Sequence, residues 1–183
     1  MDVKLWSAAL IEAARCEFGA IVASVPADQR KLKGELKRWS PKDEMAHLVY
    51  WLELYAANLK SRRAGIEPED VTNYQARNDA AWPARSSWTW GEVERAWQQA
   101  LQAVAAELKC LSEEAQRAQM RSLVYELVDH PHHHFVRLYG KFGQRKLGRA
   151  LLARTEALLA QRGASRWTAT TRRKVKRWAL ELS

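Results

Sequence analysis

The sequence predicts an all-α protein, and three observations support this fold class. Apolar residues recur every three or four positions in several long segments, which is the spacing of one buried helix face. Only 8 Gly and 5 Pro occur among 183 residues, which disfavours a turn-rich all-β protein. No segment alternates apolar and polar residues as a half-buried strand does. We therefore expect an antiparallel four-helix bundle with a long loop between the second and third helices and a basic C-terminal helix.

The first two expected helices have recognisable ends. The first spans about residues 3–25 and precedes a proline. The second begins after Ser40, a favourable N-cap, with Pro41 at the first helical position and Asp43 near the positive end of the helix dipole. Gly65 is suited to end this helix, because glycine tolerates the left-handed backbone of a C-terminal cap.

A long connection separates the second helix from the third. Residues 66–88 contain two prolines and many polar side chains, and they predict an ordered loop of a length that often carries function. Thr89 and Glu92 have the spacing of a capping box and start the third helix. Ser112 opens a further short helical piece.

The remaining sequence is helical but interrupted. Pro131 either starts a helix at its first turn or kinks one helix in two. The segment of about residues 132–161 contains three glycines that weaken and can divide it, and a final amphipathic piece follows. We expect a bundle domain over residues 1–163 and a basic amphipathic extension over residues 164–183.

Composition and charge limit the functional classes. Two cysteines are too few for a disulfide scaffold and indicate the cytoplasm, and no apolar run approaches the ~20 residues that span a bilayer. Residues 141–183 hold twelve Lys and Arg against two acids, whereas the rest of the chain holds 18 against 19. Basicity therefore belongs to the C-terminal quarter and not to the body of the fold.

The histidines form the most distinctive pattern. Four of the five lie within residues 130–134, and His47 lies far upstream beside the apolar stripe of the second helix. His130 and His134 are four apart, so on a helix their side chains lie one above the other and can reach one metal ion. His130 and His133 are also at helical spacing, and the pattern does not choose between the two pairs. The alternatives are an exposed polar run and hydrogen-bonded core histidines.

Two short motifs resemble one protein family. Residues 39–51, WSPKDEMAHLVYW, are similar to the second-helix motif of the DinB/YfiT-like superfamily, and residues 130–134, HPHHH, resemble its H-x-x-x-H motif. Asn78 and the later WTWGEVERAW resemble the linker and third-helix start, and the ClbS/DfsB-like branch is the nearest. The resemblance covers about residues 5–160 and leaves the basic tail outside it.

The resemblance implies a function and a site. Members are four-helix bundles, mostly homodimers, with a divalent metal held by three histidines, here His47, His130 and His134. It implies a metal-dependent hydrolase or thiol-transferase that acts on a small electrophilic substrate, with Zn, Ni or Fe as the metal. Some ClbS/DfsB-like proteins act without metal, so a metal-free small-molecule resistance hydrolase is the alternative.

Neighbouring residues complete the predicted site. Glu44 and Asp129 are candidates to accept hydrogen bonds from the metal-binding imidazoles, and helix capping is the competing role for Asp43. Tyr50 and Arg137 are candidate catalytic residues. We expect Trp51 and Trp97 to line an apolar pocket beside the metal, and apolar residues on both sides of the first helix (Leu5, Trp6 and Ile11) to support a homodimer.

The basic tail suggests a second class of function. Its basic residues alternate with tryptophans, a pattern that suits phosphate contacts and base stacking. We favour the simpler interpretation, in which Val175, Trp178 and Leu182 dock on the bundle and the basic face stays in water. The candidate nucleic-acid-binding residues are Arg172, Arg173, Lys174, Lys176 and Arg177.

Overall fold

The chain is all-helical, as the sequence predicts. The structure, a computed structural model, describes residues 2–68, 71–162 and 166–182, and within these ranges it contains no strand beyond one isolated bridge between Glu35 and Arg38. None of the described helices combines the length and apolar character needed to cross a bilayer. The chain divides into two compact units. We call Met1–Ser24 with Ser112–Ser183 the split unit and Val25–Leu111 the continuous unit.

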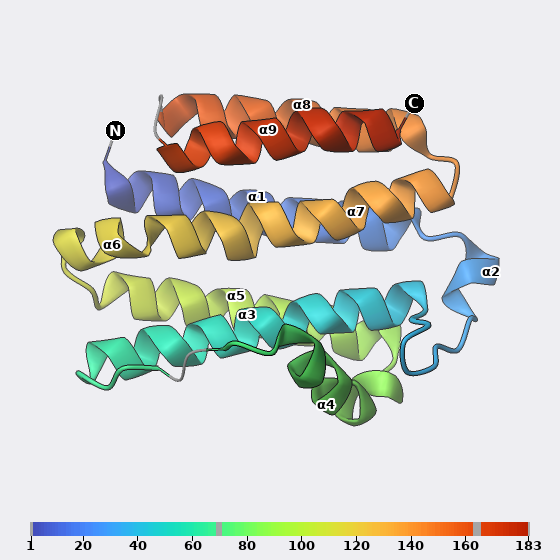
Figure 1. The fold of residues 1–183 in the computed structure, drawn as a ribbon, viewed down its shortest axis with the longest axis horizontal. Helices are drawn as coiled ribbons and strands as arrows, with labels where there is room; N and C mark the ends of the chain where they lie inside the picture. The colour runs from blue at the N-terminus through green and yellow to red at the C-terminus, as the bar shows by residue number, and fades with distance from the viewer. Residues whose placement is uncertain (1, 69–70, 163–165, 183) are drawn as a thin grey trace. The chain divides into compact units, whose positions relative to one another are not determined.

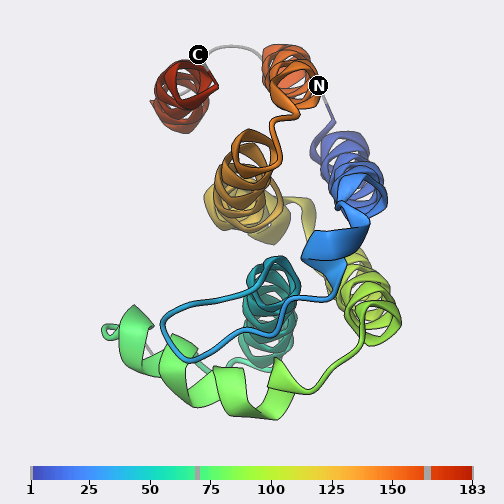
Figure 2. The same ribbon diagram turned by 90° about the vertical axis from the view of Figure 1, so that its right-hand side faces the viewer.

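The split unit is built from long helices that pack side by side (Figures 1 and 2). In Figure 1, α8 runs opposite to α7 and α9. The helix α1 runs in the same direction as the continuous rod formed by α6, η1 and α7. The helix α8 packs against both α7 and α9, and α1 packs against α6. The elements are α1 (Val3–Ser24), α6 (Glu113–Val124), η1 (Tyr125–Asp129), α7 (His130–Lys141), α8 (Arg145–Arg162) and α9 (Arg166–Glu181).

The α6–η1–α7 rod shows how the chain accommodates Pro131. Proline has no N–H, and its ring clashes with the carbonyl four residues earlier in a regular α-helix. Directly before it, η1 is a π-helix, in which the N–H of His130 reaches back five residues to the carbonyl of Tyr125. The chain therefore stays helical, and Pro131 is the second residue of α7. His130 and His134 keep the helical spacing that their sequence predicts.

The turn between α7 and α8 divides the long helix expected over residues 132–161. Gly143 has φ +70°, a conformation that favours glycine, and it lies between the end of α7 and the start of α8. The N–H of Gln144 donates to the carbonyl of Tyr139, and its side-chain amide donates to the carbonyl of Ser24 at 2.8 Å. This turn thus also holds the end of α1.

The predicted docking of the C-terminal helix is confirmed. Val175, Trp178 and Leu182 are almost completely buried, and α9 packs on α7 and α8. Lys174 donates to the carboxylate of Asp129 at 2.5 Å. An apolar stripe and the Lys174–Asp129 ion pair therefore attach α9 to the other helices of the split unit.

The continuous unit contains α2 (Ala27–Arg30), α3 (Pro41–Arg63), α4 (Tyr74–Ser86) and α5 (Trp90–Lys109). In Figure 1, α3 and α5 run in the same direction, and they make an extensive contact. This pair is parallel, unlike the antiparallel neighbours that the sequence predicts. A parallel neighbour requires the chain to return along the whole of α3, roughly 35 Å for its 23 residues. That return explains the long connection between them.

The helix α4 lies inside the segment predicted to be a loop, so that part of the prediction is wrong. Asn73 caps it by accepting a hydrogen bond from the N–H of Ala76 at 3.0 Å. None of its residues is fully buried, and Pro83 lies within it. This helix could not be recognised from the sequence, because α4 lacks a buried apolar stripe and contains a proline.

The predicted helix starts are confirmed. Ser40 and Asp43 form a capping box at the start of α3, and Thr89 and Glu92 form another at the start of α5. Asp43 thus performs the capping role considered for it. Gly65 also follows α3 with the left-handed backbone expected of it, at φ +74°.

Candidate metal ligands and the α3–α4 pocket

His130 and His134 form a close pair on α7. Their ring centres are 5.2 Å apart, and the rings meet edge to face. Two imidazoles that share a tetrahedral Zn²⁺, with Zn–N bonds of about 2.0–2.1 Å, have ring centres roughly 5 Å apart. The pair therefore has a separation suited to a common ion.

A half-buried acid lies beside this pair. The carboxylate of Glu126 is 4.0 Å from Nδ1 of His130, one helical turn earlier, and burial raises the pKa of Glu126 although His130 acts to lower it. Tyr125 stacks on the ring of His130 with the ring centres 5.8 Å apart. Sequence analysis missed Glu126, although its position four residues before His130 was a usable signal.

The predicted partner acid, Asp129, is engaged elsewhere in the same unit. Its carboxylate accepts from Lys174 on α9, and the ammonium of Lys174 also lies 5.5 Å from the ring centre of Tyr125. The other oxygen of Asp129, Oδ1, is buried and has no hydrogen-bond partner. A contact of Asp129 with a metal-binding histidine stays a prediction.

His133 has a different environment from His134. Its ring stacks on Trp178 of α9, nearly parallel, with ring centres 6.0 Å apart. Partial burial lowers the pKa of His133, and the neighbouring His134 acts in the same direction. His134 and not His133 is the close neighbour of His130, which favours the His130–His134 pair.

His132 is a core histidine. It is 2% exposed, and its Nδ1 lies 2.8 Å from Oγ1 of Thr155. The hydroxyl of Thr155 donates its single proton to the carbonyl of Leu151, so Nδ1 of His132 must donate to Thr155. Burial, aided by Arg154, lowers the pKa of His132 to about 3, so its ring is neutral. This residue is the hydrogen-bonded core histidine considered for the cluster.

His47 lies on α3 in the continuous unit, among aromatic side chains. Its ring centre is 4.8 Å from that of Trp39 and 6.3 Å from that of Trp51, and the side chain is half-buried. Since His130 and His134 belong to the split unit, the three-histidine site stays a prediction from the sequence.

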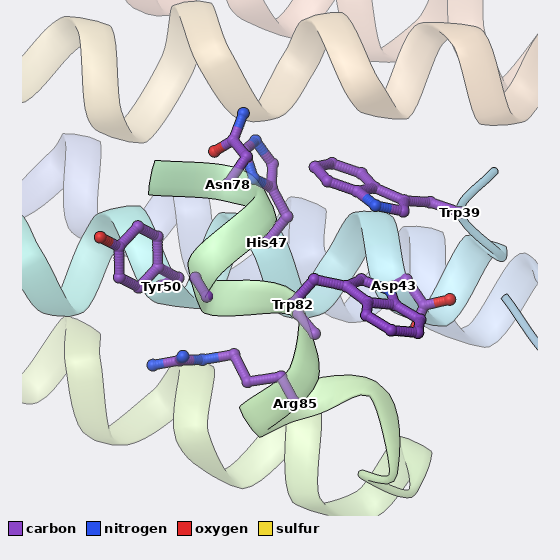
Figure 3. Close-up of a pocket in the computed structure, with 9 residues that line it drawn as sticks. Trp39, Asp43, His47, Tyr50, Asn78, Trp82 and Arg85 are labelled. Carbon is purple, nitrogen blue, oxygen red and sulfur yellow. The ribbon is translucent and has the colours of Figure 1, made fainter. Parts of the chain in front are cut away.

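A pocket opens beside His47 between α3 and α4 (Figure 3). The empty space between its lining residues is about 270 Å³, a value that includes open solvent at the mouth. In Figure 3, Asn78 lies beside His47, Arg85 lies below Tyr50, and the two indoles lie on the opposite side. The lining residues are Trp39, Asp43, Ala46, His47, Tyr50, Asn78, Ala81, Trp82 and Arg85.

Polar contacts hold α4 over this pocket. Arg85 donates to Glu53 on α3 at 2.5 Å, and its guanidinium lies 5.1 Å from the ring centre of Tyr50. The indole N–H of Trp51 donates to Oδ1 of Asn78 at 2.9 Å. Lys42 donates to the carbonyl of the last α4 residue at 2.9 Å. These contacts fix the wall of the pocket that α4 forms, although no α4 residue is fully buried.

The structure separates the other predicted site residues. Tyr50 lines the pocket, Glu44 is half-buried on α3, and Arg137 is exposed on α7. Trp51 packs against His47 and Trp97 is fully buried in the core, and neither lines the α3–α4 pocket. The sequence singled out Asn78 of α4 as part of a linker motif, but it assigned no α4 residue to a pocket, because it predicted a loop there.

The basic residues of α9 remain largely at the surface. Arg173, Lys176 and Arg177 are exposed, Arg172 is half-buried, and Lys174 is paired with Asp129 as described above. Trp178 is 1% exposed, so its indole has no open face on which a base could stack. The helix retains its cationic surface but lacks this aromatic element of the predicted nucleic-acid interface.

Comparison with known proteins adds no relative. No family model, no curated protein sequence and no solved structure matches this chain.

Proposed function

We propose that the protein is a metal-dependent hydrolase or thiol-transferase of the DinB-like type, with His47, His130 and His134 as ligands of a divalent metal. The observation that carries the proposal is the His130–His134 pair, whose rings lie 5.2 Å apart on α7. The motif resemblance around His47 supports the third ligand. An antiparallel four-helix bundle of that superfamily is part of the same proposal.

The donor set suits a borderline divalent ion. Neutral imidazoles are preferred ligands of Zn, Ni and Fe, and three of them leave a coordination position open for reaction. A metal in such a site acts as a Lewis acid and lowers the pKa of a bound water or thiol. Within the split unit, Glu126 lies one turn from His130 and is placed to orient that ring.

The substrate side of the proposal rests on the continuous unit. The α3–α4 pocket presents His47 among aromatic side chains, and Tyr50 and Arg85 lie on its wall. A small molecule in this pocket would lie next to the imidazole of His47. Tyr50 is the candidate to exchange a proton with substrate, because it is the phenol that lines the pocket.

Metal content tests the proposal. Wild type, His47→Ala and His134→Ala are expressed without a tag, and metal per chain is measured with the melting temperature. We expect the wild type to hold one ion and both variants to lose most of it. His133→Ala is the matched control, because His133 stacks on Trp178 and is not a proposed ligand.

The rival role for His47 gives a different result. If His47 only fills a polar position in the core, its removal costs about 1–3 kcal/mol of stability and leaves metal content unchanged. Equal metal in wild type and His47→Ala therefore contradicts the proposal. A wild type that takes up none of Zn²⁺, Ni²⁺ or Fe²⁺ favours the metal-free alternative instead.

A further inference from the structure

The α3–α4 pocket contains buried hydrogen-bond donors that have no partner. The indole N–H groups of Trp39 and Trp82 and Nε of Arg85 are buried, and none of the three forms a hydrogen bond. All three residues line this pocket. A buried donor without a partner destabilises the folded protein by about 1–3 kcal/mol. A ligand that supplies acceptor atoms to these three donors would remove that penalty.

A fourth donor lies on the same wall. Oδ1 of Asn78 accepts the indole N–H of Trp51, which fixes the orientation of the amide and leaves its NH₂ group to donate. In Figure 3, this amide lies beside His47. The pocket therefore offers N–H groups from two indoles, one guanidinium and one amide.

The carboxylate acceptors of the pocket are already occupied. Both oxygens of Asp43 accept hydrogen bonds, one from Lys42 at 2.9 Å and the other from the backbone and hydroxyl of Ser40 at 3.0 and 2.7 Å. In Figure 3, the carboxylate of Asp43 points away from His47. An occupant must therefore supply acceptor atoms, and a ligand that carries only donors would leave the pocket unsatisfied.

We infer that the α3–α4 pocket binds the carboxylate of a small aromatic acid. A carboxylate supplies two oxygens with about four acceptor sites, which matches the donors present. Trp39, Trp82 and Tyr50 provide aromatic walls for a ring. The site depends on neither a metal nor the proposed reaction, since every residue that forms it lies in the continuous unit.

Charge favours a single carboxylate over a more highly charged anion. Arg85 is paired with Glu53, whose side chain is 39% exposed and screened by water, whereas that of Arg85 is 18% exposed. Arg85 is the Arg or Lys among the lining residues and already shares its charge with Glu53, so the pocket does not supply the positive charge that a dianion requires. A phosphate dianion is therefore disfavoured.

Titration with benzoate tests the inference on metal-depleted protein from which the chelator has been removed. The readout is the ¹H–¹⁵N spectrum of the tryptophan indoles, assigned with Trp39→Phe and Trp82→Phe. We expect benzoate to shift the signals of Trp39 and Trp82 saturably. Benzylamine, which has the same ring and no acceptor, should leave both signals in place.

Variants give changes of opposite sign. Trp82→Phe keeps an aromatic ring, removes one donor and should weaken benzoate binding roughly tenfold. Glu53→Gln removes the carboxylate that competes for Arg85 and should tighten binding. Trp90→Phe is the matched control, because its indole donates to the carbonyl of Arg30 outside the pocket, and it should leave affinity unchanged.

Three results would overturn the inference. The first is that indole signals of Trp39 and Trp82 exchange with water but do not respond to benzoate, which means that water alone satisfies the donors. The second is an equal response to benzylamine. The third is unchanged affinity in both Trp82→Phe and Glu53→Gln, with melting temperatures that show both proteins folded. Metal content affects none of these readouts, so the test is separate from that of the proposed function.

Discussion

His132 shows how a single buried residue makes stability depend on pH. Its Nε2 is buried without a partner, while Nδ1 donates to Thr155. A protonated ring would require a second buried N–H and a buried charge without a counter-ion. The folded protein therefore retains the neutral ring, with a pKa of about 3 against an ordinary value of 6.5.

This difference predicts acid destabilisation through one residue. Between its ordinary pKa and its folded-state pKa, the unfolded chain binds a proton that the folded chain does not, so stability falls as the pH falls from about 6.5 towards 3. The loss reaches roughly 3 kcal/mol by about pH 4. Urea unfolding of metal-depleted His132→Leu, which has no imidazole at this position, should show a correspondingly smaller difference between neutral and acid pH. An identical pH dependence in wild type and variant would contradict this account.

The histidine cluster shows what residue-level sequence reasoning can predict. Spacing placed His130 and His134 on one helix face but left His130–His133 as an alternative pair. It could not assign His132 to the core or His133 to a stack on Trp178, since both depend on where α8 and α9 pack. The spacing of Glu126 from His130 would have indicated this acid, whereas the pocket donors Trp82 and Arg85 lie on a helix that the sequence did not predict.

At the scale of elements, the close approach of α8 to the end of α9 depends on a glycine. A Cβ on Gly148 would lie 2.8 Å from both terminal methyl carbons of Leu182 and 3.3 Å from Cβ of Tyr139. Leu182 is completely buried and has little room to move. The small residue therefore allows the two helices to meet at this point.

Two glycine substitutions of opposite effect test this packing. Gly148→Ala should lower the free energy of unfolding by about 1–3 kcal/mol, because the added methyl overpacks the contact with Leu182. Gly19→Ala on α1 meets nothing within 4 Å and should raise it by about 0.5–1 kcal/mol, since alanine is the better helix former. Chemical denaturation of both variants provides the comparison. A stabilised Gly148→Ala would show that the end of α9 is not held against α8.

Element prediction succeeded where local chemistry determines the outcome. The N-cap Ser40 marked the start of α3 and capping-box spacing marked that of α5, and both starts form capping hydrogen bonds. It failed at α4, whose place is determined by pairing with α3 through Arg85–Glu53 and Trp51–Asn78 and not by a buried face. The parallel direction of α3 and α5 could not be predicted from local sequence patterns either, because it depends on the path of the segment that connects them.

At the scale of the whole molecule, the apolar residues of α1 expected at a dimer interface differ in their exposure. Leu5 is 69% exposed, whereas Trp6, also expected on an outer face, is completely buried. Ile11 is half-buried. The apolar surface available on α1 is therefore smaller than the sequence suggested.

We propose a homodimer in which Leu5 contributes to the interface. Light scattering at micromolar concentration should give twice the chain mass of 21.0 kDa for the wild type and a lower mass for Leu5→Glu. Leu180→Glu is the control, since Leu180 is a similarly exposed leucine on α9. A monomeric wild type would refute the proposal, and equal masses for the two variants would exclude Leu5 from the interface.

The division of the chain also determines the order in which its parts can fold during synthesis. Val25–Leu111 is one unbroken stretch of sequence, so the contacts within this unit can form as soon as it leaves the ribosome. The contacts of α1 form later, since Phe18 packs against Phe135 and Glu17 pairs with Arg154, and both partners are synthesised near the end of the chain. At about 5–20 residues per second, α1 would present its apolar face to solvent for several seconds or longer. A nascent chain of this kind is a natural client for a chaperone that binds near the exit tunnel and releases α1 once α8 has been made.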